Sequence, residues 1–194
     1  MTQTQPLVVI MGVSASGKST VGKLLAARLN VNYADGDNFH SQANITKMRS
    51  GIPLDDDDRW PWLDTIGDWL HDHASTGAVI SCSALKRIYR DRLRAAAPGI
   101  VFLHLSGGVE ELRRRIAARK DHFMPASLLD SQLETLEPLQ KDETGVAIEL
   151  TQGREIIVNE FLDWLESSSH QSPSSKTGKV RSPARFKASP GRSA

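Results

Sequence analysis

The sequence predicts one α/β domain in which helices cover both faces of a parallel sheet. Three observations predict it: short apolar segments alternate with segments of helical spacing, a glycine-rich turn follows the first apolar segment, and 194 residues suit one domain. The first segment, LVVIM, is continuously apolar, as in a strand that is covered on both faces. The expected strands are residues 7–11, 31–34, 78–81, 101–105 and 146–150.

Apolar residues at helical spacing mark the segments between these strands. Val21, Leu24 and Leu25 share one helical face after the first strand, and Trp62 and Ile66 share one before the third. A run of Gly, Pro and acidic residues, GIPLDDDDR, predicts a loop at its place in the chain. Further helices are expected at residues 44–50, 86–97, 109–116, 128–136 and 157–165.

The glycine-rich turn has the pattern G-x-x-x-x-G-K-S and lies between a buried strand and a helix, the context in which this pattern binds phosphate. Its backbone N–H groups and the helix N-terminus can hold phosphates. Lys18 can reach the β- and γ-phosphates, and the Ser19 hydroxyl can bind Mg²⁺. The residues expected to bind a nucleoside triphosphate are Gly12, Val13, Ser14, Ala15, Ser16, Gly17, Lys18, Ser19 and Thr20.

Two carboxylates, Asp35 and Asp37, flank Gly36 directly after the second strand. Carboxylates this close repel each other unless a positive charge lies beside them. The third strand ends without the acid that GTPases and motor ATPases usually carry, so we expect Asp35 to approach Mg²⁺ through a bound water. Asp37 then faces the acceptor and takes the proton of its attacking hydroxyl. This division of roles favours a small-molecule kinase.

Five segments of the chain together resemble the gluconokinases of the P-loop kinase group. They are GVSASGKSTVG, DGDNFH, NITKMRSGIPLDDDDRWPWL, CSALKRIYRDRLR and HFMPASLLDSQLETLEPLQKDE. The phosphate loop alone is shared by many families, but the combination is specific and spans residues 7–165. Two positions depart from the family pattern: Ala15 stands where glycine is common, and Ser41 stands where proline is frequent.

The resemblance implies a three-layer P-loop kinase fold with a five-stranded parallel sheet and a small lid at about residues 119–136. It implies ATP- and Mg²⁺-dependent phosphorylation of D-gluconate at its terminal hydroxyl, giving 6-phospho-D-gluconate and ADP. A homodimer is also expected, because dimers are common in the resembling family. Another small-molecule P-loop kinase, such as a shikimate or nucleoside kinase, is an alternative, although it would not need the CSALK or HFM segments.

Gluconate is a polyol carboxylate, so its site needs a cation and several hydrogen-bonding groups. Arg59, Lys86 and Arg90 supply cations within the matched motifs, and His40 supplies a hydrogen-bond donor or acceptor. Each cation could instead pair with an acidic neighbour on the surface, Arg59 with residues 55–58 most obviously.

The lid segment supplies the third expected catalytic residue. With Lys18 and Asp37, Arg119 is expected to act on the transferring phosphoryl group, where its charge stabilises the charge that develops. Arg115 could share this role, and Gln132 could reach the hydroxyl groups of the acceptor.

The C-terminal residues 169–194 form a basic tail, which we expect to be disordered beyond a kinase domain of residues 1–168. From residue 170 on, the tail holds six Lys or Arg and no acid, which leaves 18 of the chain's 24 basic residues against 23 acidic ones, a net charge of −5. The tail suggests a second alternative, a nucleic-acid-binding protein that takes ATP only as a ligand. The acidic domain disfavours specific nucleic-acid binding.

Composition excludes other classes of protein. The chain is 39% hydrophobic and 24% charged, values typical of a soluble globular protein. No apolar run approaches the roughly 18 residues of a membrane helix, and the N-terminus lacks the basic start of a signal peptide. The single cysteine, Cys82, excludes an internal disulfide and favours a reducing, cytoplasmic location.

Overall fold

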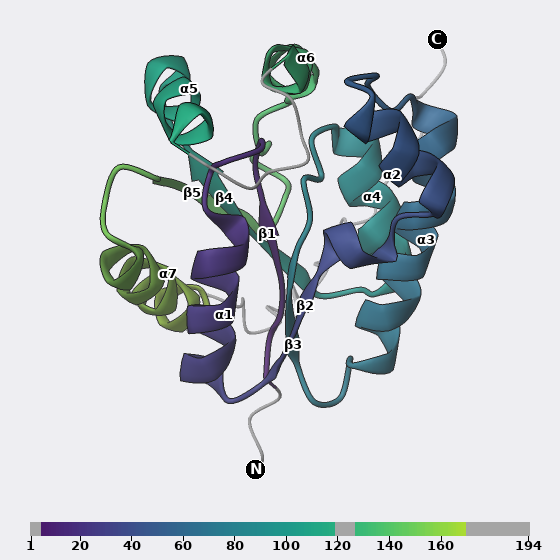
Figure 1. Cartoon of the computed structure of the whole chain (residues 1–194). Coiled ribbons are helices and arrows are strands. Elements are labelled where there is room, and N and C mark those ends of the chain that lie inside the picture. Colours follow the sequence, from purple (N-terminus) through teal and green to yellow (C-terminus); the bar gives the residue numbers. More distant parts are fainter. Residues whose placement is uncertain (1–4, 119–126, 170–194) are drawn as a thin grey trace, which may run out of the picture.

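A computed structural model of the chain describes residues 5–118 and 127–169, and it contains a five-stranded parallel sheet of order β2-β3-β1-β4-β5 (Figure 1). The strands are β1 (Leu7–Met11), β2 (Asn32–Asp35), β3 (Ala78–Ser81), β4 (Ile100–Ser106) and β5 (Gly145–Glu149). Each lies within one residue of its predicted position. The prediction of an α/β fold on a parallel sheet is confirmed.

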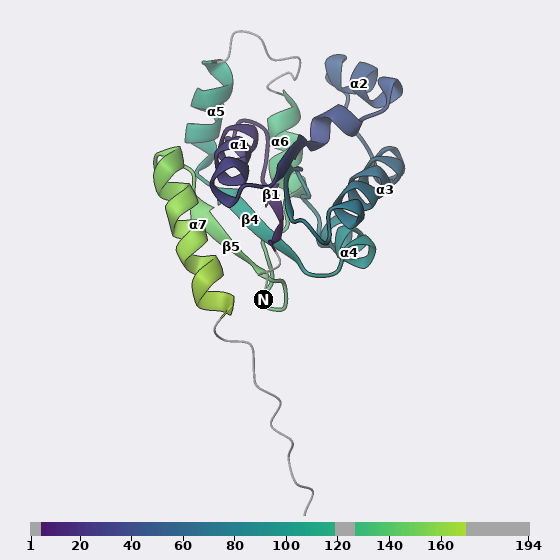
Figure 2. The same ribbon diagram turned by 90° about the horizontal axis from the view of Figure 1, so that it is seen from below.

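A short 3₁₀ helix, Gly36–Phe39, follows β2, and seven α-helices lie in these ranges of the chain. They are α1 (Lys18–Leu29), α2 (Gln42–Arg49), α3 (Asp56–Asp72), α4 (Arg87–Ala96), α5 (Val109–Ala117), α6 (Ser127–Thr135) and α7 (Arg154–Ser169). Figure 2 shows α1 and α7 on one face of the sheet and α3 and α4 on the other. None of these helices is long and apolar enough to span a membrane.

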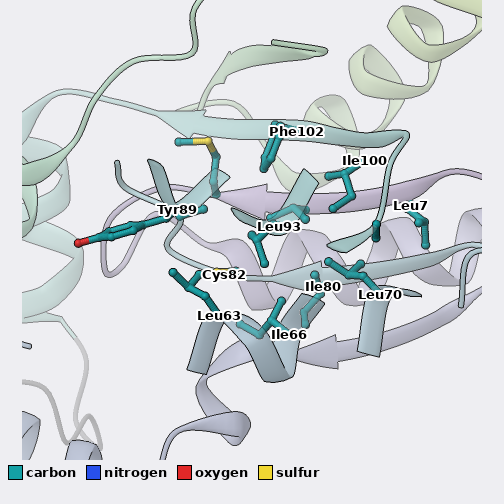
Figure 3. Packing of buried hydrophobic residues seen from close by; sticks show 14 of the residues in the cluster. Leu7, Leu63, Ile66, Leu70, Ile80, Cys82, Tyr89, Leu93, Ile100 and Phe102 are labelled. Carbon is teal, nitrogen blue, oxygen red and sulfur yellow. The ribbon is translucent and has the colours of Figure 1, made fainter. Parts of the chain in front are cut away.

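Two hydrophobic cores follow from the alternation of side chains along β1. Leu7, Val9 and Met11 point to the face covered by α3 and α4, where they pack with residues such as Leu63 and Leu93 (Figure 3). The residues between them point to α1 and α7 and pack with the second core. Because both faces of β1 are buried, the strand is continuously apolar, and the phosphate-binding turn that follows it has a rigid support.

The predicted loop at residues 51–59 is partly wrong, because α3 already begins at Asp56. The Asp55 carboxylate accepts a hydrogen bond from the Asp58 N–H at 2.9 Å, and the Asp58 carboxylate accepts one from the Asp55 N–H at 2.9 Å. This reciprocal capping box satisfies N–H groups at the start of the helix, where acidic side chains also face the positive end of the helix dipole. The acidic run is therefore a helix start.

Candidate active site

The phosphate loop, residues 12–17, joins the end of β1 to the start of α1 at the carboxyl edge of the sheet. Gly12 and Gly17 adopt positive φ angles of 138° and 97°. A Cβ at Gly12 would also lie 2.9 Å from the Leu105 carbonyl oxygen, so the loop approaches β4 too closely for any side chain there. Ala15 adopts a φ of 64°, a left-handed conformation that costs an L-residue energy.

Replacing Ala15 with glycine is expected to stabilise the fold by up to about 1.6 kcal/mol. Relief of the left-handed conformation gives about 1–2 kcal/mol, and the greater freedom of glycine in the unfolded chain takes back about 0.4–1 kcal/mol. Urea denaturation measures the difference, with Ala27→Gly, at an exposed position in the last turn of α1, as a control that should destabilise. A loss of stability in Ala15→Gly would contradict the assigned strain.

The loop fits a chain of phosphates. Ser16 Oγ is buried and has no hydrogen-bond partner among the described residues, which is uncommon for a hydroxyl and suits an incoming anionic oxygen. Lys18 Nζ donates to the Val13 carbonyl oxygen at 2.9 Å, so its ammonium group lies over the loop. These residues can hold the phosphates of a nucleotide.

The predicted metal ligands lie together at the ends of β2 and α1. The Ser19 hydroxyl donates to Asp35 Oδ2 at 2.6 Å, and the Asp37 N–H donates to Asp35 Oδ1 at 3.2 Å. Burial acts to raise the pKa of Asp35, but the hydrogen bonds from Ser19, Asp37, Ser81 and Tyr33 outweigh it and hold this pKa below its ordinary value. Asp35 is thus an ionised carboxylate beside the Ser19 hydroxyl, a donor set of the kind that Mg²⁺ accepts.

Gly36 separates the two acids for a reason of packing. A Cβ at this position would collide with the Ser81 carbonyl oxygen at the end of β3. Trp62 Nε1 donates to the Gly36 carbonyl oxygen at 2.7 Å and fixes the turn from the other side. The chain therefore turns sharply here, and Asp35 and Asp37 occupy different surroundings.

Two pockets lie on opposite sides of the phosphate loop. The first, the Asp37 pocket, is reached by Ser14 and Lys18 of the loop and includes Asp37, His40, Arg59, Ser83, Ser131 and Gln132. The second, the Arg115 pocket, is reached by the loop residues Ala15, Ser16 and Gly17 and includes Thr20, Arg115, Gln152 and Arg154. A chain of phosphates on the loop would therefore extend from one pocket to the other.

His40 and Arg59, two of the expected acceptor-binding residues, line the Asp37 pocket. The His40 ring stacks on Trp62 with 4.3 Å between the ring centroids. Burial, together with the charge of Arg59, lowers the pKa of His40 to about 4, so the imidazole is neutral at pH 7 and serves as a hydrogen-bonding group. Arg59 adds a second cation to the pocket beside Lys18, and its Nη1 donates to the Tyr89 hydroxyl at 3.2 Å.

Lys86 lies beside the Asp37 pocket and does not line it. Its Nζ donates to both oxygens of Asp56, at 2.7 and 3.0 Å, in a neighbouring depression that also includes Arg59. The Tyr89 hydroxyl donates to the same carboxylate, and Arg59 Nη1 lies 4.0 Å from it. Figure 3 shows the hydroxyl of Tyr89 pointing away from the core that its ring enters. Asp56 thus binds Lys86 and lies close to Arg59 at the edge of the pocket.

Lys86→Met is expected to raise the KM for an anionic acceptor about 3- to 10-fold and to leave the KM for the nucleotide unchanged. Without Lys86, Asp56 attracts Arg59 alone, and one charge-assisted contact is worth about 1–1.5 kcal/mol at a partly exposed site. Steady-state kinetics with each substrate varied measures both constants, with Lys141→Met as the control for a lost surface charge. A change in the nucleotide KM would place Lys86 in the nucleotide site instead.

The expectation for Arg90 needs correction, because the structure places this residue in the core. Its side chain is fully buried, and its Nε and Nη2 donate to Glu143 at 2.7 and 2.9 Å. The remaining guanidinium hydrogens bind backbone carbonyls of residues 84, 85, 137 and 138, at 3.1–3.3 Å. Every donor direction is used, so Arg90 joins α4 to the segment before β5 and is not available to a substrate.

Arg115 and Gln132, for which the sequence predicted only secondary roles, both lie at the phosphate loop. Arg115 donates to Glu111 and to the Leu150 carbonyl oxygen, both at 2.7 Å, and lines its pocket beside the loop. Gln132 Oε1 accepts a hydrogen bond from the Ser14 N–H of the phosphate loop at 2.6 Å. Arg119 and residues 119–126 of the expected lid (119–136) lie outside the described residues, as does the expected tail from residue 170 on.

Comparison with known proteins assigns this geometry to a family. The family model described as shikimate kinase matches residues 14–166. Gluconokinase of Gluconobacter oxydans is 45% identical over 157 residues, which are 80% of this chain and 88% of the relative. Thermosensitive gluconokinase of Escherichia coli is 45% identical over 141 residues, 71% of this chain and 75% of the relative. The chain belongs to the gluconokinase family.

A solved gluconokinase from Sinorhizobium meliloti agrees with this assignment at the level of structure. It superposes on this gluconokinase-family chain with a TM-score of 0.79 at 44% identity, covering 88% of this chain and 99% of that one. Shikimate kinase from Aquifex aeolicus, at 17% identity and a TM-score of 0.55, shows the shared fold alone. The predicted P-loop kinase fold and the predicted class, a phosphotransferase, are confirmed.

Proposed function

We propose that the enzyme transfers the γ-phosphoryl group of ATP to the terminal hydroxyl of D-gluconate, giving 6-phospho-D-gluconate and ADP in gluconate catabolism. The observation that carries this proposal is the pair of pockets on one phosphate loop. A phosphate chain on the loop leads from the Arg115 pocket to the Asp37 pocket, so a donor in one and an acceptor in the other meet at Ser14 and Lys18.

On the donor side, the nucleoside occupies the Arg115 pocket, and residues 12–20 hold the phosphates. Lys18 neutralises the charge at the β- and γ-phosphates, and the Ser16 hydroxyl gains a partner there. Mg²⁺, when bound, would supply positive charge that offsets the negative charge of the phosphate groups. Ser19 would hold this ion directly and Asp35 through a water, as the hydrogen bond between their side chains suggests. Arg119 from the lid remains a candidate for the transferring phosphoryl group.

On the acceptor side, the Asp37 pocket has the chemistry that a polyol carboxylate needs. Arg59 is the cation for the carboxylate, held in place by Tyr89, and neutral His40 offers a nitrogen to a hydroxyl. Asp37 accepts the proton of the terminal hydroxyl and directs its oxygen toward the γ-phosphorus. Lys86 acts on the carboxylate end through Asp56 and Arg59.

An acceptor panel tests the proposed function. ADP release is measured with ATP and gluconate, shikimate or nucleosides in turn, and the phosphorylated product is identified by ³¹P NMR. We expect robust turnover with gluconate and a primary phosphate monoester at its terminal carbon. Turnover with another acceptor and none with gluconate would contradict the proposal and identify the enzyme as a P-loop kinase with a different substrate.

Asp35→Asn is expected to shift the Mg²⁺ titration of activity to higher concentration, about 10-fold or more, with little change in gluconate affinity. The amide keeps an oxygen beside Ser19 but removes the charge that attracts the hydrated ion, and one charge-assisted contact is worth about 1.5–3 kcal/mol. Mg²⁺ titrations at saturating ATP and gluconate measure the shift. An unchanged titration would remove Asp35 from the metal site.

We further propose a cytoplasmic location, a homodimer, and no specific nucleic-acid or membrane partner. Cys82 supports the reducing compartment: burial raises the pKa of its thiol to about 12, so it is an inert core residue. Size-exclusion chromatography with light scattering decides the oligomeric state, and a filter-binding assay with and without residues 170–194 decides nucleic-acid binding.

A further inference from the structure

A hydrogen bond joins the phosphate loop to α6 across 118 positions of the sequence. The Ser14 N–H donates to Gln132 Oε1 at 2.6 Å, and both residues line the Asp37 pocket. Lys18 Nζ is likewise turned back onto the loop, 2.9 Å from the Val13 carbonyl oxygen. Two groups on the acceptor side, the Ser14 N–H and the Lys18 ammonium, are thus held by oxygens of the protein itself.

The backbone of Gln132 is held firmly in place. Before it in the chain, Leu129 packs in a cluster with Val13 and Leu85. The carbonyl oxygen of Gln132 itself accepts a hydrogen bond from the Leu136 N–H at 3.0 Å. The next residue, Glu137, donates its N–H to the Leu85 carbonyl oxygen at 2.8 Å. Because this backbone is fixed, any response of Gln132 to a ligand in the pocket is a rotation of its side chain.

A phosphate oxygen and an amide oxygen compete unequally for the Ser14 N–H. Hydrogen bonds to a charged acceptor are about twice as strong as those between neutral groups. Because Ser14 faces the Asp37 pocket while Ala15 and Gly17 face the Arg115 pocket, the phosphate nearest Ser14 is the last of the chain. A triphosphate reaches this N–H, and a diphosphate, which is one phosphoryl group shorter, leaves it with Gln132.

We propose that Gln132 is a positioning residue that couples the terminal phosphate of the nucleotide to the acceptor pocket. Its Oε1 holds the Ser14 N–H until the γ-phosphate displaces it, and the side-chain amide then turns to the acceptor, where it hydrogen-bonds hydroxyl groups. This inference rests on the proposed function for the identity of the acceptor. It requires that the acceptor bind more tightly to the triphosphate complex than to the ADP complex, and the coupling is reciprocal.

Calorimetry of gluconate binding tests the coupling. Its Kd is measured with Mg²⁺ and either ADP or a non-hydrolysable ATP analogue, in the unmodified enzyme, in Gln132→Ala and in the control Gln140→Ala, whose side chain contacts Arg87. We expect binding about five-fold or more tighter with the analogue in the unmodified enzyme and the control, and less than two-fold tighter in Gln132→Ala. An equal ratio in all three proteins would overturn the proposal, whatever the absolute affinities.

A second arm needs no acceptor. Gln132→Glu adds a negative charge beside the Ser14 N–H, so it should weaken binding of the ATP analogue at least about 10-fold more than binding of ADP, since two like charges then meet at one donor. Gln140→Glu should leave the ratio unchanged. Equal losses for both nucleotides would refute the place of Gln132 at the terminal phosphate. If the unmodified enzyme bound no gluconate, the proposed acceptor would fail, and this arm would still decide the role of Gln132.

Discussion

Asp37→Asn should lower turnover with gluconate by about 100-fold or more, within the range that loss of a general base costs. The amide has the same shape as the carboxylate but cannot accept the proton of the attacking hydroxyl. Asp37 lines the acceptor pocket with Ser14 and Lys18, and its backbone N–H, which the substitution keeps, donates to Asp35, so the loop and the metal ligands stay in place. The measurement is kcat at saturating ATP, Mg²⁺ and gluconate.

The control for this prediction separates catalysis from binding. Asp68→Asn removes the same charge from an exposed position on α3 and should leave kcat unchanged. Calorimetry should give Asp37→Asn an affinity for ATP–Mg²⁺ within about two-fold of the unmodified enzyme, because the phosphate loop is intact. Normal turnover, or a metal defect equal to that of Asp35→Asn, would contradict the separate roles of the two acids.

Arg90→Ala should destabilise the fold by about 3–5 kcal/mol, the cost of removing one partner from a buried ion pair. The substitution removes the cation that is hydrogen-bonded to the buried Glu143 carboxylate, and it leaves the backbone carbonyls of residues 84, 137 and 138 without the donor they have now. In a domain of this size, each kcal/mol lowers Tm by about 2–4 °C, so a fall of roughly 10 °C is expected. Urea and thermal denaturation measure the loss.

A matched control for Arg90 lies two residues further along α4. Arg92 makes a bidentate ion pair with Asp64 at 2.5 and 2.8 Å, but both side chains are about half exposed. Exposed pairs contribute about 1 kcal/mol or less, so Arg92→Ala should cost far less than Arg90→Ala. Equal costs would show that burial does not set the value of the Arg90–Glu143 pair.

The fold was predictable because its signals are local. The strands β1, β3 and β4 are short apolar runs, and the pattern of the phosphate loop requires a strand before it and a helix after it. The start of α3 was missed because an acidic run after Gly51 and Pro53 also suits a loop. The capping box of Asp55 and Asp58 distinguishes the two, and it depends on geometry that composition does not contain.

The candidate site also has a part that the sequence predicts and a part that depends on residues far apart in the chain. Two short segments of the chain contain residues 12–20, Asp35 and Asp37. The spacing of the residue types in these segments is enough to predict phosphate and metal binding. Arg90 and Lys86 stand in motifs that look alike in sequence, yet Arg90 binds Glu143, 53 positions away, and is buried. Which cation meets substrate depends on such distant partners, and so does the bond from Gln132 to the loop.

The central claim is that gluconate occupies the Asp37 pocket with its terminal hydroxyl at Asp37 and its carboxylate at Arg59. A crystal structure of the enzyme with gluconate, Mg²⁺ and a non-hydrolysable ATP analogue tests it directly. The account predicts about 2.6–3.2 Å between the terminal hydroxyl oxygen and a carboxylate oxygen of Asp37, the hydrogen-bonding reach of a general base. Gluconate bound in the reverse direction, or in the Arg115 pocket, would contradict it.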